Sequence, residues 1–176
     1  MKILAIDPGY DKVGIAVLEK KPKEKESLLF SECFSPYKNI KKNERILEVG
    51  KRVKEIIKKY KVEALAIESL FFNKNHKTAL VVAEAKGVIT YESGLVGIFI
   101  EEFTPLQVKM AITGNGKSDK NQVNNMVSRL IDLKGKKPKD DDEYDAIAVG
   151  LTFFAFQIKK DLGLSTTLNK GIYKKN

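Results

Sequence analysis

The chain has 176 residues, of which 43% are hydrophobic and 31% charged, and its formal net charge is +9. This composition is typical of one soluble globular domain and excludes a disordered chain, and no apolar run approaches the about 20 residues of a membrane span. The basic excess is almost all lysine and favours a polyanionic partner, with nucleic acid ahead of an anionic membrane. A lysine-rich surface in a heat-adapted protein would give the same charge. The single cysteine, Cys33, excludes an internal disulfide and indicates a reducing cytoplasm.

Hydrophobic periodicity predicts strands and helices arranged as a mixed α/β sandwich. The predicted strands span residues 2–6, 13–17, 27–35, 62–69 and 95–103. The predicted helices span residues 39–60, 77–93, 104–112 and 146–158, and a further helix follows Ser118 as its N-cap. Residues 161–176 form a basic segment without a clear period, so we expect one domain over residues 1–160 and a flexible tail after it.

Two acidic residues end strands that are otherwise apolar. Asp7 follows the strand 2–6, and Glu68 ends the run ALAIE. A buried, unpaired carboxylate costs several kcal/mol or more, so a partner, a metal ion or solvent must compensate each of them. If these two strands are neighbours in the sheet, Asp7 and Glu68 meet at one of its ends.

A second pair of acids lies at the start of the last predicted helix. Asp142 and Asp145 are three residues apart and therefore share a helix face, which a helix packed on the same end of the sheet would bring to the strand acids. Two carboxylates 4 Å apart repel by about 4 kcal/mol at an effective dielectric of about 20. A hard divalent cation such as Mg²⁺ removes that cost, although Asp142 alone also fits a solvated helix start. The residues by themselves predict metal-dependent phosphate chemistry on a basic α/β domain.

Four segments, in order along the chain, resemble the motifs of the RuvC family of bacterial Holliday junction resolvases. They read AIDPGYDKVGIAV, AIESLFFNKNHKTALVVAEAKGVI, FTPLQVKMAITGNGKSDKNQV and DEYDAIAVG, within residues 2–152. The resemblance implies a ribonuclease H-like fold, with a five-stranded mixed sheet flanked by helices, and a homodimer. It also implies two Mg²⁺ ions per active site, replaceable by Mn²⁺, on four catalytic and metal-binding acids. These acids are Asp7, Glu68, Asp142 and Asp145, with Asp140 and Asp141 as alternatives for the third.

The implied activity is that of a crossover junction endodeoxyribonuclease. Such an enzyme cuts two opposed strands of a four-way DNA junction during recombination and repair, and leaves 5′-phosphate nicks that a ligase can seal. The resemblance makes the branch-migration proteins RuvA and RuvB candidate partners. It also implies that Phe71 stacks on an unpaired base at the junction centre. Basic positions implied to contact DNA are Lys74, Lys109, Lys117 and Lys120.

Three other functions fit part of the sequence. An actin-like or sugar-kinase-like ATPase shares the Asp-x-Gly loop, but it needs a second nucleotide-binding half that 176 residues do not hold. A ribonuclease H-like nuclease of the YqgF type shares the first motif, but lacks FFNKN and TGNGK. A non-catalytic junction-binding module would not need all four acids, and a Mg²⁺ requirement for cleavage separates it from an enzyme.

Overall fold

The computed structural model describes residues 1–9, 11–37, 39–70 and 76–161. Within these ranges the chain forms a five-stranded sheet and five helices. The strands are β1 (Lys2–Asp7), β2 (Val13–Glu19), β3 (Ser27–Phe34), β4 (Ala64–Glu68) and β5 (Phe99–Phe103). The helices are α1 (Lys42–Tyr60), α2 (His76–Leu95), α3 (Pro105–Thr113), α4 (Lys120–Leu130) and α5 (Asp141–Asp161). The proposed tail lies almost wholly outside the described residues, so the domain division stays a prediction.

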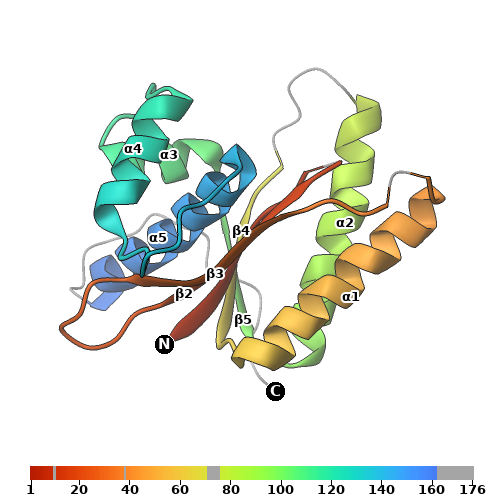
Figure 1. Cartoon of the computed structure of the whole chain (residues 1–176), viewed down its shortest axis with the longest axis horizontal. Coiled ribbons are helices and arrows are strands. Elements are labelled where there is room, and N and C mark those ends of the chain that lie inside the picture. The colour runs from red at the N-terminus through yellow and green to blue at the C-terminus, as the bar shows by residue number, and fades with distance from the viewer. Residues whose placement is uncertain (10, 38, 71–75, 162–176) are drawn as a thin grey trace.

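The sheet is mixed and has the strand order β3-β2-β1-β4-β5. β1, β2 and β3 pair as antiparallel neighbours, whereas β4 pairs in parallel with β1 on one side and with β5 on the other. Figure 1 shows α1 and α2 on one face of the sheet and α3, α4 and α5 on the other. The expected mixed α/β fold with helices on both faces is therefore confirmed.

The alternation of side chains along the central strands decides which way the strand acids point. Successive residues of a strand face opposite sides of the sheet. In β1, Ile3 and Ala5 pack in the core with α5, while the even-numbered residues pack in the core with α1. Asp7 continues the odd-numbered series, and Glu68 likewise continues the series that Ala66 forms in β4. Both acids therefore belong to the face that α5 covers.

Two glycines allow α5 to lie close to this face. A Cβ atom on Gly14 in β2 would lie 2.0 Å from the carbonyl oxygen of Asp142, and one on Gly150 in α5 would lie 2.8 Å from a methyl group of Leu18. Side chains at either position would push the helix away from the strands. Gly14 also pairs with Asp7 across β1 and β2, so the close approach brings the first turn of α5 beside the end of β1.

The first turn of α5 is anchored to the sheet by Glu143. This glutamate is only 6% exposed. Its Oε2 accepts a hydrogen bond from the Ser31 hydroxyl of β3, and its Oε1 accepts from the backbone N–H groups of Lys139 at 2.9 Å and Asp140 at 3.3 Å. Free N–H groups at a helix start need such acceptors. Glu143 thus satisfies the helix terminus and holds it against β3.

The start of α4 differs from the sequence-based expectation, since Asp119 and not Ser118 is its N-cap. The Asp119 carboxylate accepts from the backbone N–H of Gln122 at 2.9 Å, and the Gln122 side chain accepts from the Asp119 N–H at 3.0 Å. This reciprocal pair satisfies two N–H groups at once, which a serine one residue earlier does not. Ser118 is buried instead, with its hydroxyl 2.8 Å from that of Thr113.

Three predicted boundaries are also wrong. α1 begins at Lys42 and not at residue 39. β5 begins at Phe99 because α2 continues to Leu95 and a turn at Gly97 follows it, whereas the sequence predicted a strand from residue 95. α5 begins at Asp141 and not at residue 146, but acidic residues form its first turn, as the placement of Asp142 and Asp145 at the helix start predicted. No helix in the described part of the chain is long and apolar enough to cross a membrane.

Replacing Glu143 by Ala should lower the free energy of unfolding by about 1–3 kcal/mol, because it leaves buried hydrogen-bonding groups without a partner. The matched control is Asp141→Ala, which removes a carboxylate from the same helix turn, but one that is largely exposed. Urea unfolding of the three proteins measures the difference. Equal stability of the Glu143→Ala variant and the control would contradict the anchoring role.

Candidate active site

Asp7 and Glu68 lie side by side at the carboxyl ends of the two central parallel strands. β1 and β4 pair in parallel with Ile6 opposite Ile67, so each acid is the next residue in line. Their carboxyl groups are joined by a side-chain hydrogen bond. Neither forms an ion pair with any residue that the structure describes. The sequence expectation that the two strand acids meet therefore agrees with their position.

The environment of this pair disfavours two negative charges. Burial raises the pKa of Asp7 from 3.8 to about 6, and repulsion from Asp145 and Asp142 also acts to raise it. Burial likewise raises the pKa of Glu68 from 4.5 to about 8, and the charge of Asp7 is the next cause. A carboxyl pair with these pKa values shares a proton near neutral pH unless a cation replaces it.

Asp145 reaches the same end of the sheet from α5, and Lys120 neutralises it. The Lys120 ammonium nitrogen lies 2.9 Å from Oδ2 of Asp145 and 3.5 Å from Oδ2 of Asp141. Burial by itself would lower the pKa of Lys120, but the hydrogen bond and charge of Asp145 raise it overall. Burial raises the pKa of Asp145, although Lys120 opposes that shift. This lysine is therefore the direct cationic partner of one of the four acids.

Asp142 faces β3 and the turn between β1 and β2. Its Oδ2 accepts a hydrogen bond from the Cys33 thiol at 3.4 Å and lies 3.9 Å from the Lys12 ammonium, which is also 3.5 Å from Asp140. Burial raises the pKa of Cys33 to about 11, and the hydrogen bond to Asp142 adds to the shift. The thiol is thus protonated and unsuited to be a nucleophile. The charge of Asp142 is also one of the causes that raise the pKa of Asp7.

The four acids lie at one end of the sheet without forming a finished cation site. Within the described ranges, no group of three or more His, Cys, Asp or Glu side chains is arranged to hold a metal ion. The Lys12 ammonium lies 3.9 Å from Asp142 and the Lys120 ammonium 2.9 Å from Asp145. The donor set nevertheless fits Mg²⁺, because all four side chains supply hard carboxylate oxygens and the central pair lacks a cationic partner in the described chain.

Of the five positions implied to contact DNA, three lie in the described chain. Lys109 in α3 is close enough to Glu68 for its charge to lower the pKa of that acid. Lys120 begins α4 beside Asp145, and Lys117 is exposed in the turn before α4, where its backbone N–H donates to the Asn115 side chain at 3.0 Å. Phe71 and Lys74 lie outside the described residues.

Sequence reasoning missed three residues around the acids, namely Lys12, Cys33 and Glu143. Cys33 pairs with Gly14 across β2 and β3, so strand pairing would have placed it on the α5 face next to Asp142. Glu143 stands three residues after the helix-flanking Asp140, which is the spacing of a reciprocal cap. Lys12 gives no comparable signal, because only the fold brings its turn to the start of α5.

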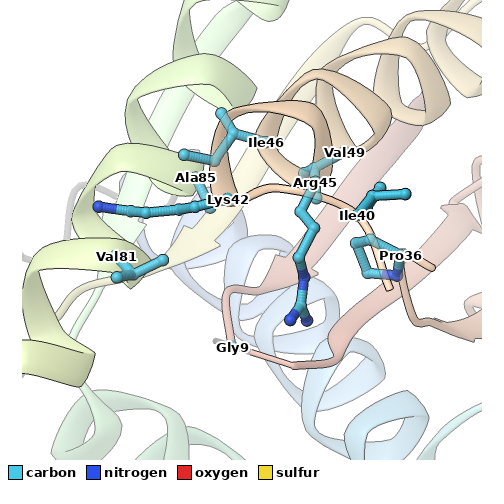
Figure 2. A pocket seen from close by; sticks show the side chains of 9 residues that line it. All are labelled: Gly9, Pro36, Ile40, Lys42, Arg45, Ile46, Val49, Val81 and Ala85. Carbon is cyan, nitrogen blue, oxygen red and sulfur yellow. The ribbon is translucent and has the colours of Figure 1, made fainter. Parts of the chain in front are cut away.

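A separate pocket of about 120 Å³ lies on the opposite face of the sheet, between α1 and α2. Figure 2 shows aliphatic side chains from both helices around it, with Arg45 directed toward Gly9. Arg45 pairs with Asp11 at 3.0 Å, and Lys42, which also lines the pocket, pairs with Glu84 at 2.8 Å. None of the four acids lines this pocket, so it is distinct from the carboxylate site.

Several known proteins with similar sequences or structures belong to one family. The family model described as crossover junction endodeoxyribonuclease RuvC matches residues 3–153. The crossover junction endodeoxyribonuclease RuvC of Thermosipho melanesiensis is 44% identical over 85% of this chain and 94% of its own. That of Fusobacterium nucleatum subsp. nucleatum is 38% identical over 97% of this chain and 89% of its own.

A solved structure, T. thermophilus RuvC in complex with Holliday junction substrate, superposes with a TM-score of 0.82 at 29% identity. The superposition covers 93% of this chain and 97% of that one. These matches confirm the predicted ribonuclease H-like fold as well as the predicted family. The chain therefore belongs to the RuvC family of crossover junction endodeoxyribonucleases.

Proposed function

We propose that this protein is a Mg²⁺-dependent Holliday junction resolvase that cuts two opposed strands of a four-way junction and leaves 5′-phosphate nicks. The observation that carries the proposal is the Asp7–Glu68 carboxyl pair, held without a cationic partner in the described chain, with Asp142 and Asp145 beside it. Family membership supports the junction as substrate, because a relative is known in complex with it.

On this proposal Asp7, Glu68, Asp142 and Asp145 would hold the metal, and Mn²⁺, a similar oxygen-seeking ion, could replace Mg²⁺. The bound ions would activate a water molecule and neutralise charge on the scissile phosphate. Asp7 would have the central role, because its pKa responds to all three other acids. The shared proton between Asp7 and Glu68 would be lost when the cation binds, since ligating carboxylates must be ionised.

Lysines beside the acids would hold the phosphate backbone. Lys109 and Lys120 already act on Glu68 and Asp145, and Lys117 lies exposed between α3 and α4. The proposed roles of Phe71 in base stacking and of Lys74 in backbone contact rest on the family resemblance.

A homodimer would place two equivalent sites on the two strands to be cut, as two-fold symmetry provides. Exposed apolar side chains on α2, in the turn after it and at the start of β5 support such an interface: these are Leu80, Tyr91, Leu95, Val96 and Phe99. A cytoplasmic location and partnership with RuvA and RuvB belong to the same proposal and rest on the family alone.

Incubation with a synthetic four-way junction and with a linear duplex of the same arms tests the function. In Mg²⁺ we expect symmetrical nicks in the junction that a ligase reseals, and no comparable cutting of the duplex. Without a divalent cation neither substrate should be cut. Equal cutting of both substrates, or cutting in EDTA, would refute the proposal.

Replacing Asp7 by Asn should abolish cleavage while junction binding persists. Loss of a metal ligand removes several kcal/mol of transition-state stabilisation, which corresponds to a rate reduction of about 10³-fold or more. In EDTA the variant should melt at a higher temperature than the wild type, because one charge leaves a repelling group. Mg²⁺ should raise the melting temperature of the wild type more than that of the variant.

The control for this variant is Asp11→Asn, which removes an exposed carboxylate from the turn after β1 and leaves the four acids intact. It should cut at the wild-type rate. An Asp7→Asn protein that melts below the wild type and still cuts would show that Asp7 has a structural role only.

The metal-free protein should lose stability as the pH rises. Asp7 and Glu68 bind protons more tightly in the folded chain than in the unfolded one. This proton binding therefore stabilises the folded state fully below about pH 4. The stabilisation is lost as the pH rises through about 6 for Asp7 and about 8 for Glu68. Each 1 kcal/mol lost lowers the melting temperature of a chain of this size by about 2–4 °C.

Thermal melts from pH 5 to pH 9 in EDTA measure this slope. Saturating Mg²⁺ should flatten it, because the cation replaces the protons, and Glu68→Gln should flatten it without metal. A melting temperature that rises over this range in EDTA, or a slope that Glu68→Gln leaves unchanged, would contradict the assignment.

A further inference from the structure

Most of the net positive charge of the chain lies in two short segments. Residues 20–26 and 129–139 together contain nine lysines and arginines against three acidic residues, in a chain whose net charge is +9. Residues 20–26 connect β2 to β3, and residues 131–139 connect α4 to α5. We call their exposed cations the basic strip: these are Lys21, Lys23, Lys25, Arg129, Lys134, Lys136, Lys137 and Lys139.

The two segments form one continuous surface. The Leu28 N–H donates to the Asp132 carbonyl at 2.9 Å, and the Asp132 N–H donates to the Glu26 carbonyl at 2.8 Å. The Lys25 ammonium donates to the carbonyl of Arg129 at 2.6 Å, at the carboxyl end of α4. Backbone and side-chain hydrogen bonds thus fix the connection after α4 against the start of β3.

The strip leads to the carboxylate site. The connection 131–139 starts beside the first residues of β3, where Lys136 donates to the Leu29 carbonyl, and ends at Asp140, which lies beside Lys12. In Figure 1 the teal segment between α4 and α5 follows this course to the start of α5. The eight residues of β3 span about 26 Å, which is the length of about eight base pairs of duplex DNA.

Most of these cations have no acidic partner within the described chain. The side chains of Lys21, Lys23, Lys134, Lys137 and Lys139 are exposed and take part in none of the ion pairs formed by the described residues. By contrast, Lys120 at the active site is paired with acids. Because hydrogen bonds already hold these segments in place, their backbone loses little conformational entropy when the lysines bind a polyanion.

We infer that the basic strip binds the sugar–phosphate backbone of one duplex arm of the junction, over about eight base pairs beyond the cut. The inference rests on the proposed function and extends it from the junction centre to an arm. A lysine-rich surface without exposed aromatic side chains suits phosphate contacts rather than base reading. An amphipathic membrane site would present large apolar groups beside the cations, whereas Leu130 at 38% exposure is the one large exposed apolar residue in these segments as described.

The experiment compares a strip variant, Lys21→Gln/Lys23→Gln/Lys137→Gln, with a control variant, Lys51→Gln/Lys54→Gln/Lys58→Gln. The control removes the same charge from exposed positions of α1, on the opposite face of the sheet. Junction affinity is measured in EDTA from 50 to 200 mM salt. The strip variant should reduce the slope of log K against log salt by about 2–3, because each lost phosphate contact contributes about 0.9. The control should keep the wild-type slope.

A thermodynamic cycle locates the contact on the arm. In a second junction, neutral methylphosphonates replace phosphates at positions 3 to 10 from the cut in one arm. The neutral arm should weaken binding by the strip variant less than binding by the wild type, since the variant has already lost part of the contacts that the neutral arm removes. Additive losses of affinity from the variant and from the neutral arm would overturn the inference, and so would wild-type affinity of the strip variant for both junctions. A strip variant that binds anionic vesicles more weakly than the wild type, but the junction equally well, would also overturn it.

Cleavage separates this inference from the proposed function. At saturating junction concentration in Mg²⁺, the strip variant should cut at the wild-type rate, because the strip contains none of the four acids. If the wild type binds in a strip-dependent way but never cuts, the nuclease proposal fails and the inference stands. If the wild type cuts and the cycle shows no coupling, the inference fails alone.

Discussion

The repulsion between carboxyl groups at the end of β1 and β4 is the constraint around which the rest of the site is arranged. Asp7 and Glu68 face α5, because each continues the series of side chains that packs under this helix. Burial raises the pKa of both, so the pair is tolerated only with a shared proton or a cation. A fold built for stability alone would have apolar residues in these places, which is why the pair indicates function.

The second constraint is the depth at which α5 packs. Gly14 and Gly150 leave room for the helix against the strands, and the anchor from Glu143 to Ser31 fixes the position of its first turn. Rigid placement matters because a metal ligand must be held within a fraction of an ångström of its productive position. The hydrogen bonds of Glu143 and the close contact at Gly14 therefore support Asp142 and Asp145 without belonging to the set of acids.

Much of this arrangement was predictable from local pattern. The isolated acids at the ends of two apolar strands predicted that Asp7 and Glu68 meet if those strands are neighbours, and a three-residue spacing predicted a common helix face for Asp142 and Asp145. The predicted N-cap of α4 was wrong, because Ser118 and Asp119 are both good caps. The hydrogen bond from the Asp119 N–H to the Gln122 side chain decides between them. The contacts of Lys12 and Cys33 with Asp142 depend on how β3 and α5 meet, which no local pattern encodes.

The distribution of charge explains how one small domain can hold both a group of acids and a polyanion. The acids occupy one end of the sheet, and Lys120 stands where α4 begins, paired with Asp145 at 2.9 Å. α4 ends at the other end of the basic strip, where the Arg129 carbonyl accepts from Lys25. On the proposed function, a divalent cation bound by the acids would compensate the charge of Asp145 in place of Lys120. The ammonium group would then be available to a phosphate, so metal binding and backbone binding would favour each other through this one side chain.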